Sequence, residues 1–82
     1  MQERTGTTAA KSSQRLRTMQ HLRKYGTITS LEAITLYGIM RLSSRVSELR
    51  GRGEPIETTI ISGVNKYGER THYAEYRLRE GN

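Results

Sequence analysis

The chain has 82 residues, enough for one compact domain but too few for a two-lobed enzyme with a cleft between its lobes. Lysine and arginine number 14 against 8 glutamates, so the net charge is +6 and we expect an anionic partner. Most of these cations are arginine, whose planar guanidinium pairs with phosphates and guanine edges, which favours nucleic acid over a membrane surface. The absence of cysteine excludes disulfide scaffolds, cysteine-ligated zinc and cysteine nucleophiles.

Several further classes of protein are not expected. No apolar segment is long enough to span a membrane or resembles a secretory signal, so we expect a cytoplasmic protein without a membrane partner. His21 and His72 lie in different predicted elements without metal-ligand spacing, and no nucleotide-binding or hydrolase motif occurs. We therefore expect no catalysis, no metal, no cofactor and no small-molecule substrate.

The N-terminal segment differs in composition from the rest. Residues 1–12 are small and polar and show no period that buries a face, so we expect a disordered basic tail. The folded domain is then expected over residues 13–80. Ser12 or Ser13 is suited to cap a first helix that runs to about Tyr25.

Leu16, Met19 and Leu22 are the apolar residues of this first helix, and their spacing predicts its buried stripe. Arg15 and Arg23 fall at the margins of the stripe. One of the two is expected to extend along the edge of the core.

A short strand and a second helix are predicted next. Thr27–Thr29 is β-branched but too short to form a sheet alone, so we expect it to join strands formed elsewhere. Thr29 and Glu32 have the spacing of a capping box, which predicts a helix that continues to about Tyr37 and ends at Gly38.

The third helix has the clearest period in the chain. It is expected from about Arg41 to Arg50, with Leu42, Val46 and Leu49 on its buried face. After it, the apolar period changes from helical to alternating, which predicts strands over residues 56–61 and 73–78. The residues between them are typical of a long hairpin loop that uses Gly68 at a positive φ.

This order of elements is that of an α+β winged helix-turn-helix, with three helices, a short strand and a C-terminal β-hairpin wing. A likeness to known proteins is carried by Thr27–Ile34, Tyr37–Arg50, Pro55–Thr58 and Tyr76–Leu78. With these residues the sequence resembles, over about Leu16 to Leu78, the small winged helix-turn-helix DNA-binding proteins of bacteriophages and prophages. The interval from Ala33 to Gly38 is five residues rather than the four of a compact helix-turn-helix, which argues against compact repressor-type docking and is compatible with the winged form.

The resemblance implies a double-stranded DNA-binding protein that regulates transcription of phage or prophage genes. A monomer of this size reaches one half-site, so a homodimer on DNA is a possible assembly. Three other interpretations stay open: an excisionase-like recombination factor, a winged-helix module that inhibits a host protein, and an RNA-binding protein.

Helical geometry selects the candidate DNA-binding residues of the third helix. If its apolar residues face inward, the residues turned outward or to the flanks are Arg41, Ser43, Ser44, Ser47, Glu48 and Arg50. An alternative is that these are only solvated residues, with Glu48 paired to Arg52 or Arg41. Arg45 lies nearer the apolar face, so a packing role at the core edge is expected for it.

Candidate phosphate contacts lie outside the third helix as well. Lys66 lies in the predicted hairpin loop and Arg70 follows it, and both suit a DNA backbone. Thr29 and Ser30 begin the second helix, where free backbone N–H groups and the helix dipole attract phosphate, although Thr29 is equally suited to cap its own helix. Positive charge is concentrated in residues 1–25, which carry six cations and one anion. We therefore expect the helices to supply most of the phosphate affinity and the wing to supplement it.

Overall fold

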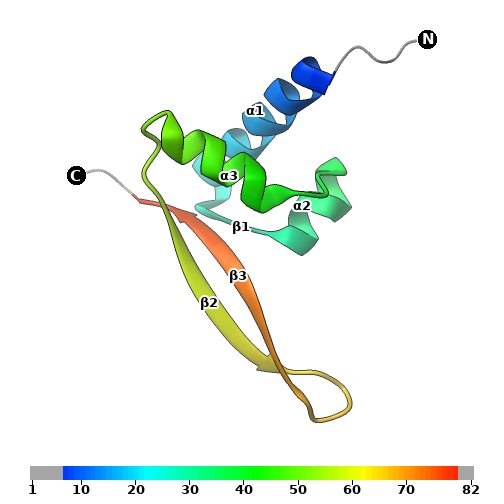
Figure 1. Cartoon of the computed structure of the whole chain (residues 1–82). Coiled ribbons are helices and arrows are strands. Elements are labelled where there is room, and N and C mark those ends of the chain that lie inside the picture. The colour runs from blue at the N-terminus through cyan, green and yellow to red at the C-terminus, as the bar shows by residue number, and fades with distance from the viewer. Residues whose placement is uncertain (1–6, 80–82) are drawn as a thin grey trace.

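The computed structural model describes residues 7–79; residues 1–6 and 80–82 lie outside the described part. Its elements in chain order are α1 (Thr7–Tyr25), β1 (Thr27–Thr29), α2 (Ser30–Tyr37), α3 (Leu42–Gly51), β2 (Ile56–Val64) and β3 (Arg70–Leu78). The three helices gather at one end, and β2 and β3 extend from them as a long hairpin (Figure 1). The predicted α+β class and order of elements are confirmed.

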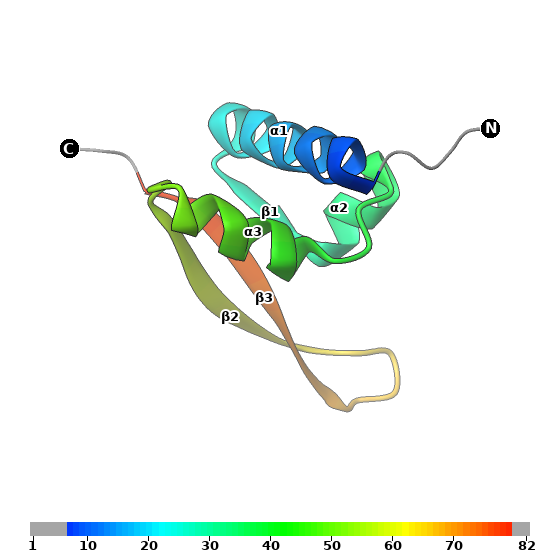
Figure 2. The same ribbon diagram turned by 45° about the horizontal axis from the view of Figure 1, so that its top comes forward.

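The sheet is antiparallel, with strand order β1-β3-β2. β1 pairs with the C-terminal part of β3, from Thr27 opposite Arg77 to Thr29 opposite Glu75. A three-residue strand gains few hydrogen bonds alone, so β1 forms by addition to the hairpin, as predicted. The helices lie together near the base of the hairpin while its distal half projects beyond them (Figure 2).

The core lies where the helices meet the base of the sheet. Its buried apolar residues are Met19, Leu22, Ile28, Ala33, Ile39, Leu42, Val46, Leu49, Ile56 and Tyr76. Gly38 and Ile39 fix the turn between α2 and α3. Gly38 adopts φ 68°, a left-handed conformation that costs glycine little, and its N–H donates to the Ile34 carbonyl at 2.9 Å. The next residue, Ile39, is fully buried and anchors the turn in the core.

The start of α1 differs from the prediction. The helix begins at Thr7, so the expected cap at Ser12 or Ser13 is wrong and residues 7–12 are helical rather than disordered. Alanine and lysine at positions 9–11 favour the helix, and the Ser12 hydroxyl accepts a hydrogen bond from Arg15 Nη2 at 3.2 Å instead of capping the backbone. The first six residues of the expected tail, and residue 80 at the expected domain end, lie outside the described residues.

The buried face of α1 is also more polar than predicted. Leu16 is 56% exposed, so its assignment to the core stripe is wrong, whereas Met19 and Leu22 are buried as expected. Thr18 and His21 are buried in its place. Both are satisfied there, because Thr18 Oγ1 donates to the Gln14 carbonyl at 2.8 Å and His21 Nδ1 lies 2.6 Å from the Tyr37 hydroxyl.

The elements that precede and follow the turn agree with the sequence signals. Thr29 Oγ1 accepts from the Glu32 N–H at 3.2 Å, and Glu32 Oε1 accepts from the Thr29 N–H at 2.9 Å, which confirms the capping box. Gly68 has φ 80°, as predicted for the hairpin loop. The loop is shorter than expected, because β2 continues through Val64.

Candidate nucleic-acid interface

The outer face of α3 is exposed and polar. Leu42, Val46 and Leu49 are buried, and this orientation leaves Ser43 and Ser47 open to solvent. Ser44 and Glu48 are half-buried on the side that faces α1. No element of the described chain covers the outer face in either view (Figures 1 and 2). The predicted inward positions of α3 agree with the structure, and Ser47 faces outward as predicted. The outward prediction is wrong for Ser44 and Glu48, because α1 packs against that side of the helix.

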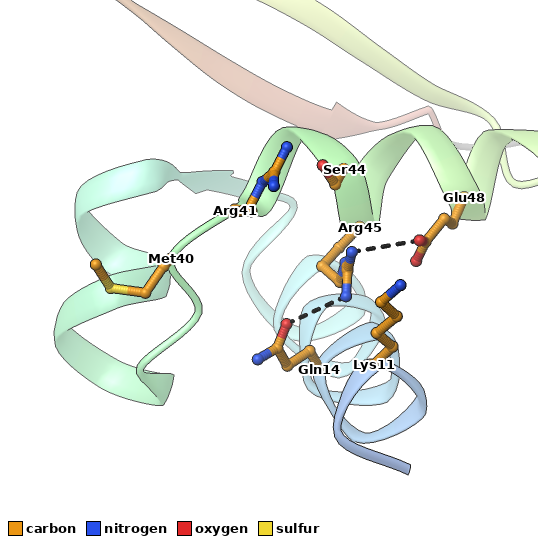
Figure 3. Close-up of a pocket in the computed structure, with 7 residues that line it drawn as sticks. All are labelled: Lys11, Gln14, Met40, Arg41, Ser44, Arg45 and Glu48. Atoms are coloured by element: carbon orange, nitrogen blue, oxygen red, sulfur yellow. Dashed lines mark hydrogen bonds and ion pairs between the residues drawn. The ribbon is translucent and has the colours of Figure 1, made fainter. Parts of the chain in front are cut away.

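Arg41 stands at the N-terminal end of α3 as its N-cap residue. It is exposed, and its side chain makes no capping hydrogen bond, so it leaves the first backbone N–H groups of the helix without a side-chain partner. Arg41 lines a cleft of about 460 Å³ between the N-terminal halves of α1 and α3. The other lining residues are Lys11, Gln14, Met40, Ser44, Arg45 and Glu48 (Figure 3). With three cations and one carboxylate, the cleft is positively charged.

A network of charged side chains ties α3 to α1 beside this cleft. Arg15 Nη1 lies 2.8 Å from Glu48 Oε1, and Arg45 Nη2 lies 3.3 Å from Glu48 Oε2. Arg45 also donates from Nη1 to Gln14 Oε1 at 3.4 Å, and it points from α3 toward α1 (Figure 3). We call Gln14, Arg15, Arg45 and Glu48 the α1–α3 clasp. In the clasp, Glu48 pairs with Arg15 and Arg45, and not with Arg52 or Arg41, the partners considered from the sequence.

The clasp fixes the charge state of Glu48. The hydrogen bond from Arg15 lowers the pKa of the Glu48 carboxyl below its ordinary value; partial desolvation opposes this shift, and the charge of Arg45 adds to it. Glu48 is thus an anion held between two guanidinium groups at neutral pH. Arg45 is 6% exposed, which confirms its expected packing role at the core edge.

Arg50 is engaged within the protein rather than free. Its Nε donates to the Ile56 carbonyl at 2.7 Å and its Nη2 donates to Thr58 Oγ1. The guanidinium also lies over the Tyr76 ring, 5.9 Å from the centroid. These contacts join the C-terminal end of α3 to the base of the hairpin, so Arg50 sets the position of the wing relative to α3.

The wing tip is held by Asn65 and presents Lys66 and Tyr67. Asn65 Oδ1 accepts from the N–H groups of Tyr67 (2.9 Å) and Glu69 (3.1 Å), while Nδ2 donates to Glu69 Oε1 at 3.0 Å. Lys66 Nζ lies 5.3 Å from the Tyr67 ring centroid, and both side chains are exposed. Arg70 begins β3 with an exposed side chain. The tip therefore offers cations on a preorganised loop.

The predicted phosphate site at the start of α2 lies beside two carboxylates. Thr29 is occupied by the capping box. It shares a cleft of about 610 Å³ with Ser30, Leu31, Tyr73 and the carboxylates of Glu32 and Glu75. Two carboxylates repel an anion, so the charge here disfavours phosphate, whereas the cleft beside Arg41 favours it.

Sequence reasoning missed the residues of α1 that contribute to this surface. Lys11 and Gln14 line the cleft, and Arg15 binds Glu48. One signal was present: Arg15 lies at the margin of the buried stripe, and α3 contains a single carboxylate for it to pair with. The structure confirms that Arg15, with 14% of its side chain exposed, rather than Arg23, lies along the core edge.

The model of the winged helix-turn-helix domain family matches residues 13–81. The chain belongs to this family. Winged helix-turn-helix domains are typically non-enzymatic modules that bind DNA. Comparisons with curated proteins and with solved structures give no significant match.

Two further observations concern other classes of function. Within residues 7–79, no group of three or more His, Cys, Asp or Glu side chains is placed to hold a metal ion. None of the helices in that range is long and apolar enough to cross a membrane.

Proposed function

We propose that this winged helix-turn-helix protein binds double-stranded DNA with the outer face of α3 in the major groove, and that it acts as a small transcriptional regulator. One observation carries the proposal. The single carboxylate of α3, Glu48, is neutralised by Arg15 and Arg45, so the outer face presents hydroxyl and guanidinium groups without a free negative charge. Such a face meets the negative potential of a DNA groove without repulsion.

The proposal divides the roles of the candidate residues. Ser43 and Ser47 on the outer face, and Ser44 beside Arg41 at the edge of the cleft, contact the bases, since hydroxyl groups bond several base edges. Arg41 pairs with guanine or a phosphate at the start of the helix. Lys66 and Arg70 contact the backbone or the minor groove from the wing. Glu48 and Arg50 act indirectly, the former by balancing the clasp and the latter by fixing the wing.

The setting is proposed on the resemblance to phage and prophage proteins, whose small winged helix-turn-helix members point to control of phage or prophage genes. A soluble location in the cytoplasm follows from that setting. Neither is needed for the DNA-binding proposal, which stands on the surface of α3 and on the family.

The test compares two pairs of variants on a duplex selected from random sequence and on an unselected duplex. Replacing Arg41 and Ser44 by alanine should cost about 1–3 kcal/mol per base contact on the selected site and remove discrimination. Replacing Lys66 and Arg70 should weaken both duplexes equally and reduce the salt slope by about 1 per lost phosphate contact. Arg52→Ala is the matched control, because it removes an exposed cation next to α3. Equal losses on both duplexes after the α3 changes would contradict the proposal.

A further inference from the structure

The outer edge of β2 is open and regularly arranged. β3 is the central strand of the sheet, so among the residues that the structure describes β2 has a partner strand on one side only. The Arg79 N–H donates to the Pro55 carbonyl at 2.8 Å, and the Asn65 N–H donates to the Glu69 carbonyl at 2.9 Å. Because hydrogen-bonded pairs alternate along an antiparallel ladder, odd-numbered residues of β2 bond to β3. The even-numbered residues therefore direct their N–H and C=O groups outward.

One end of this edge is already closed within the chain. The Ile56 N–H donates to the Glu54 carbonyl at 2.9 Å, and the Ile56 carbonyl accepts from Arg50 Nε. Within residues 7–79, the outward backbone groups of residues 58–64 have no such cover. An uncharged edge strand of this length is a template for another strand.

The sequence of β2 is complementary to itself in one register. On the face that packs toward α3, the strand reads Ile56, Thr58, Ile60, Ser62 and Val64. If a second β2 runs antiparallel with Ile60 opposite Ile60, the open residues place Ile60 against Ile60 and the Thr58 hydroxyl against the Ser62 hydroxyl, while Val64 falls beside the closed end at Ile56. Shifting the register so that Ile60 faces Ser62 or Thr58 mixes apolar residues with hydroxyls.

Charge and exposure support the same register. On the other face, Glu57, the only charged residue of β2, falls opposite Gly63 of the second copy, so no like charges meet. Ile60 and Val64 are 62% and 68% exposed in the single chain. Pairing would cover Ile60 and satisfy the open backbone groups of residues 58–62 together.

We propose that two copies of this chain pair through their β2 edges, with Ile60 at the two-fold axis. The axis of an antiparallel strand pair is perpendicular to the sheet, so both α3 helices remain on the same side of a six-stranded sheet. The pairing itself is independent of DNA. Its use, to present two α3 helices to two half-sites, rests on the function proposed above.

The size of the interface sets when the pair forms. A few residues along one edge bury less than the roughly 1,200 Å² of a stable specific interface. We therefore expect a weak dimer in free solution, which becomes populated when adjacent half-sites hold two copies together and raise their effective concentration.

Disulfide trapping tests the register directly, because the chain contains no cysteine. In the proposed pair, the two residues at position 60 face each other with Cα atoms about 5.5 Å apart, within disulfide range. The two residues at position 59 are diagonal neighbours, about 7–8 Å apart, beyond easy reach of a disulfide. Under mild oxidation, Ile60→Cys should form a covalent dimer about tenfold faster or more than Thr59→Cys, which is equally open to solvent. Equal rates, or no dimer from either variant, would overturn the proposal.

A charge exchange provides a second test by sedimentation on a duplex with two half-sites. Ile60→Lys and Ile60→Glu should each bind the duplex without cooperativity, since like charges would face each other at the axis. An equal mixture of the two variants should bind cooperatively again, because opposite charges would then meet. Thr59→Lys places the same charge on the opposite face and should remain cooperative. Failure of the mixture to recover cooperativity would count against the pairing. The proposed function fails separately, if the unmodified protein binds no duplex while Ile60→Cys still forms the dimer.

Discussion

Arg50 links α3 to the wing, and its replacement by alanine should destabilise the free protein. The change removes two hydrogen bonds, to the Ile56 carbonyl and the Thr58 hydroxyl, each contributing about 0.5–1.5 kcal/mol. It also removes a contact with the Tyr76 ring at 5.9 Å, near the limit for a cation–π interaction and contributing about 0.5 kcal/mol. Because the side chain is largely exposed, the lower part of the range applies, and we expect a loss of about 1.5–2.5 kcal/mol.

Thermal and urea unfolding followed by circular dichroism measure this loss. For a domain of this size it corresponds to a melting temperature lower by roughly 6–20 °C. Arg52→Ala removes the same charge two residues away from an exposed position, so it should change stability by less than about 0.5 kcal/mol. Thr58→Val combined with Arg50→Ala should show a coupling of at least about 0.5 kcal/mol in a double-mutant cycle. If Arg50→Ala is as stable as Arg52→Ala, Arg50 does not join the wing to α3.

Substitutions in α1, in the turn after α2 and in the clasp test three other parts of the structure. Leu22→Ala, at a side chain 1% exposed, should lower the free energy of unfolding by about 2–5 kcal/mol, whereas Leu16→Ala should change it by less than about 0.5 kcal/mol; comparable losses in urea unfolding would contradict the assigned face of α1. Gly38→Ala should cost about 1–2 kcal/mol, because φ 68° is unfavourable for alanine, and a neutral change in the same assay would argue against that turn. Since the folded-state pKa of Glu48 is lowered, the clasp stabilises the protein above the ordinary carboxyl pKa, and this stability is lost as the pH falls from about 5 through the folded-state pKa. Glu48→Gln should flatten that acid dependence in unfolding experiments, and parallel curves for both proteins would rule the clasp out as its source.

Local signals predicted much of the fold. The capping box at Thr29, the buried period of α3 and the positive φ at Gly68 each depend on residues within a few positions of one another, and all three are confirmed. Which residues of α1 are buried was harder to predict from the sequence. Leu16 carried the apolar signal, but His21 occupies the core because its ring nitrogen meets the Tyr37 hydroxyl, 16 residues along the chain.

In the candidate interface, too, local features were predictable and long-range contacts were not. Helical period alone separated the outer serines of α3 from its buried leucines. The partner of Glu48 was beyond reach of sequence spacing, since Arg15 lies 33 residues away and meets it only when α1 packs against α3. The same is true of Arg50, whose bonds to β2 depend on how the chain turns after Gly51.

The central claim, that this protein binds double-stranded DNA, is tested most directly by fluorescence anisotropy of a labelled duplex at several salt concentrations, with single-stranded DNA and RNA alongside. We expect duplex binding to be preferred, with log affinity falling linearly as log salt rises, at a slope of about 0.9 per phosphate contacted. No duplex binding at low salt, despite a net charge of +6, would contradict the account and direct the search to a protein partner.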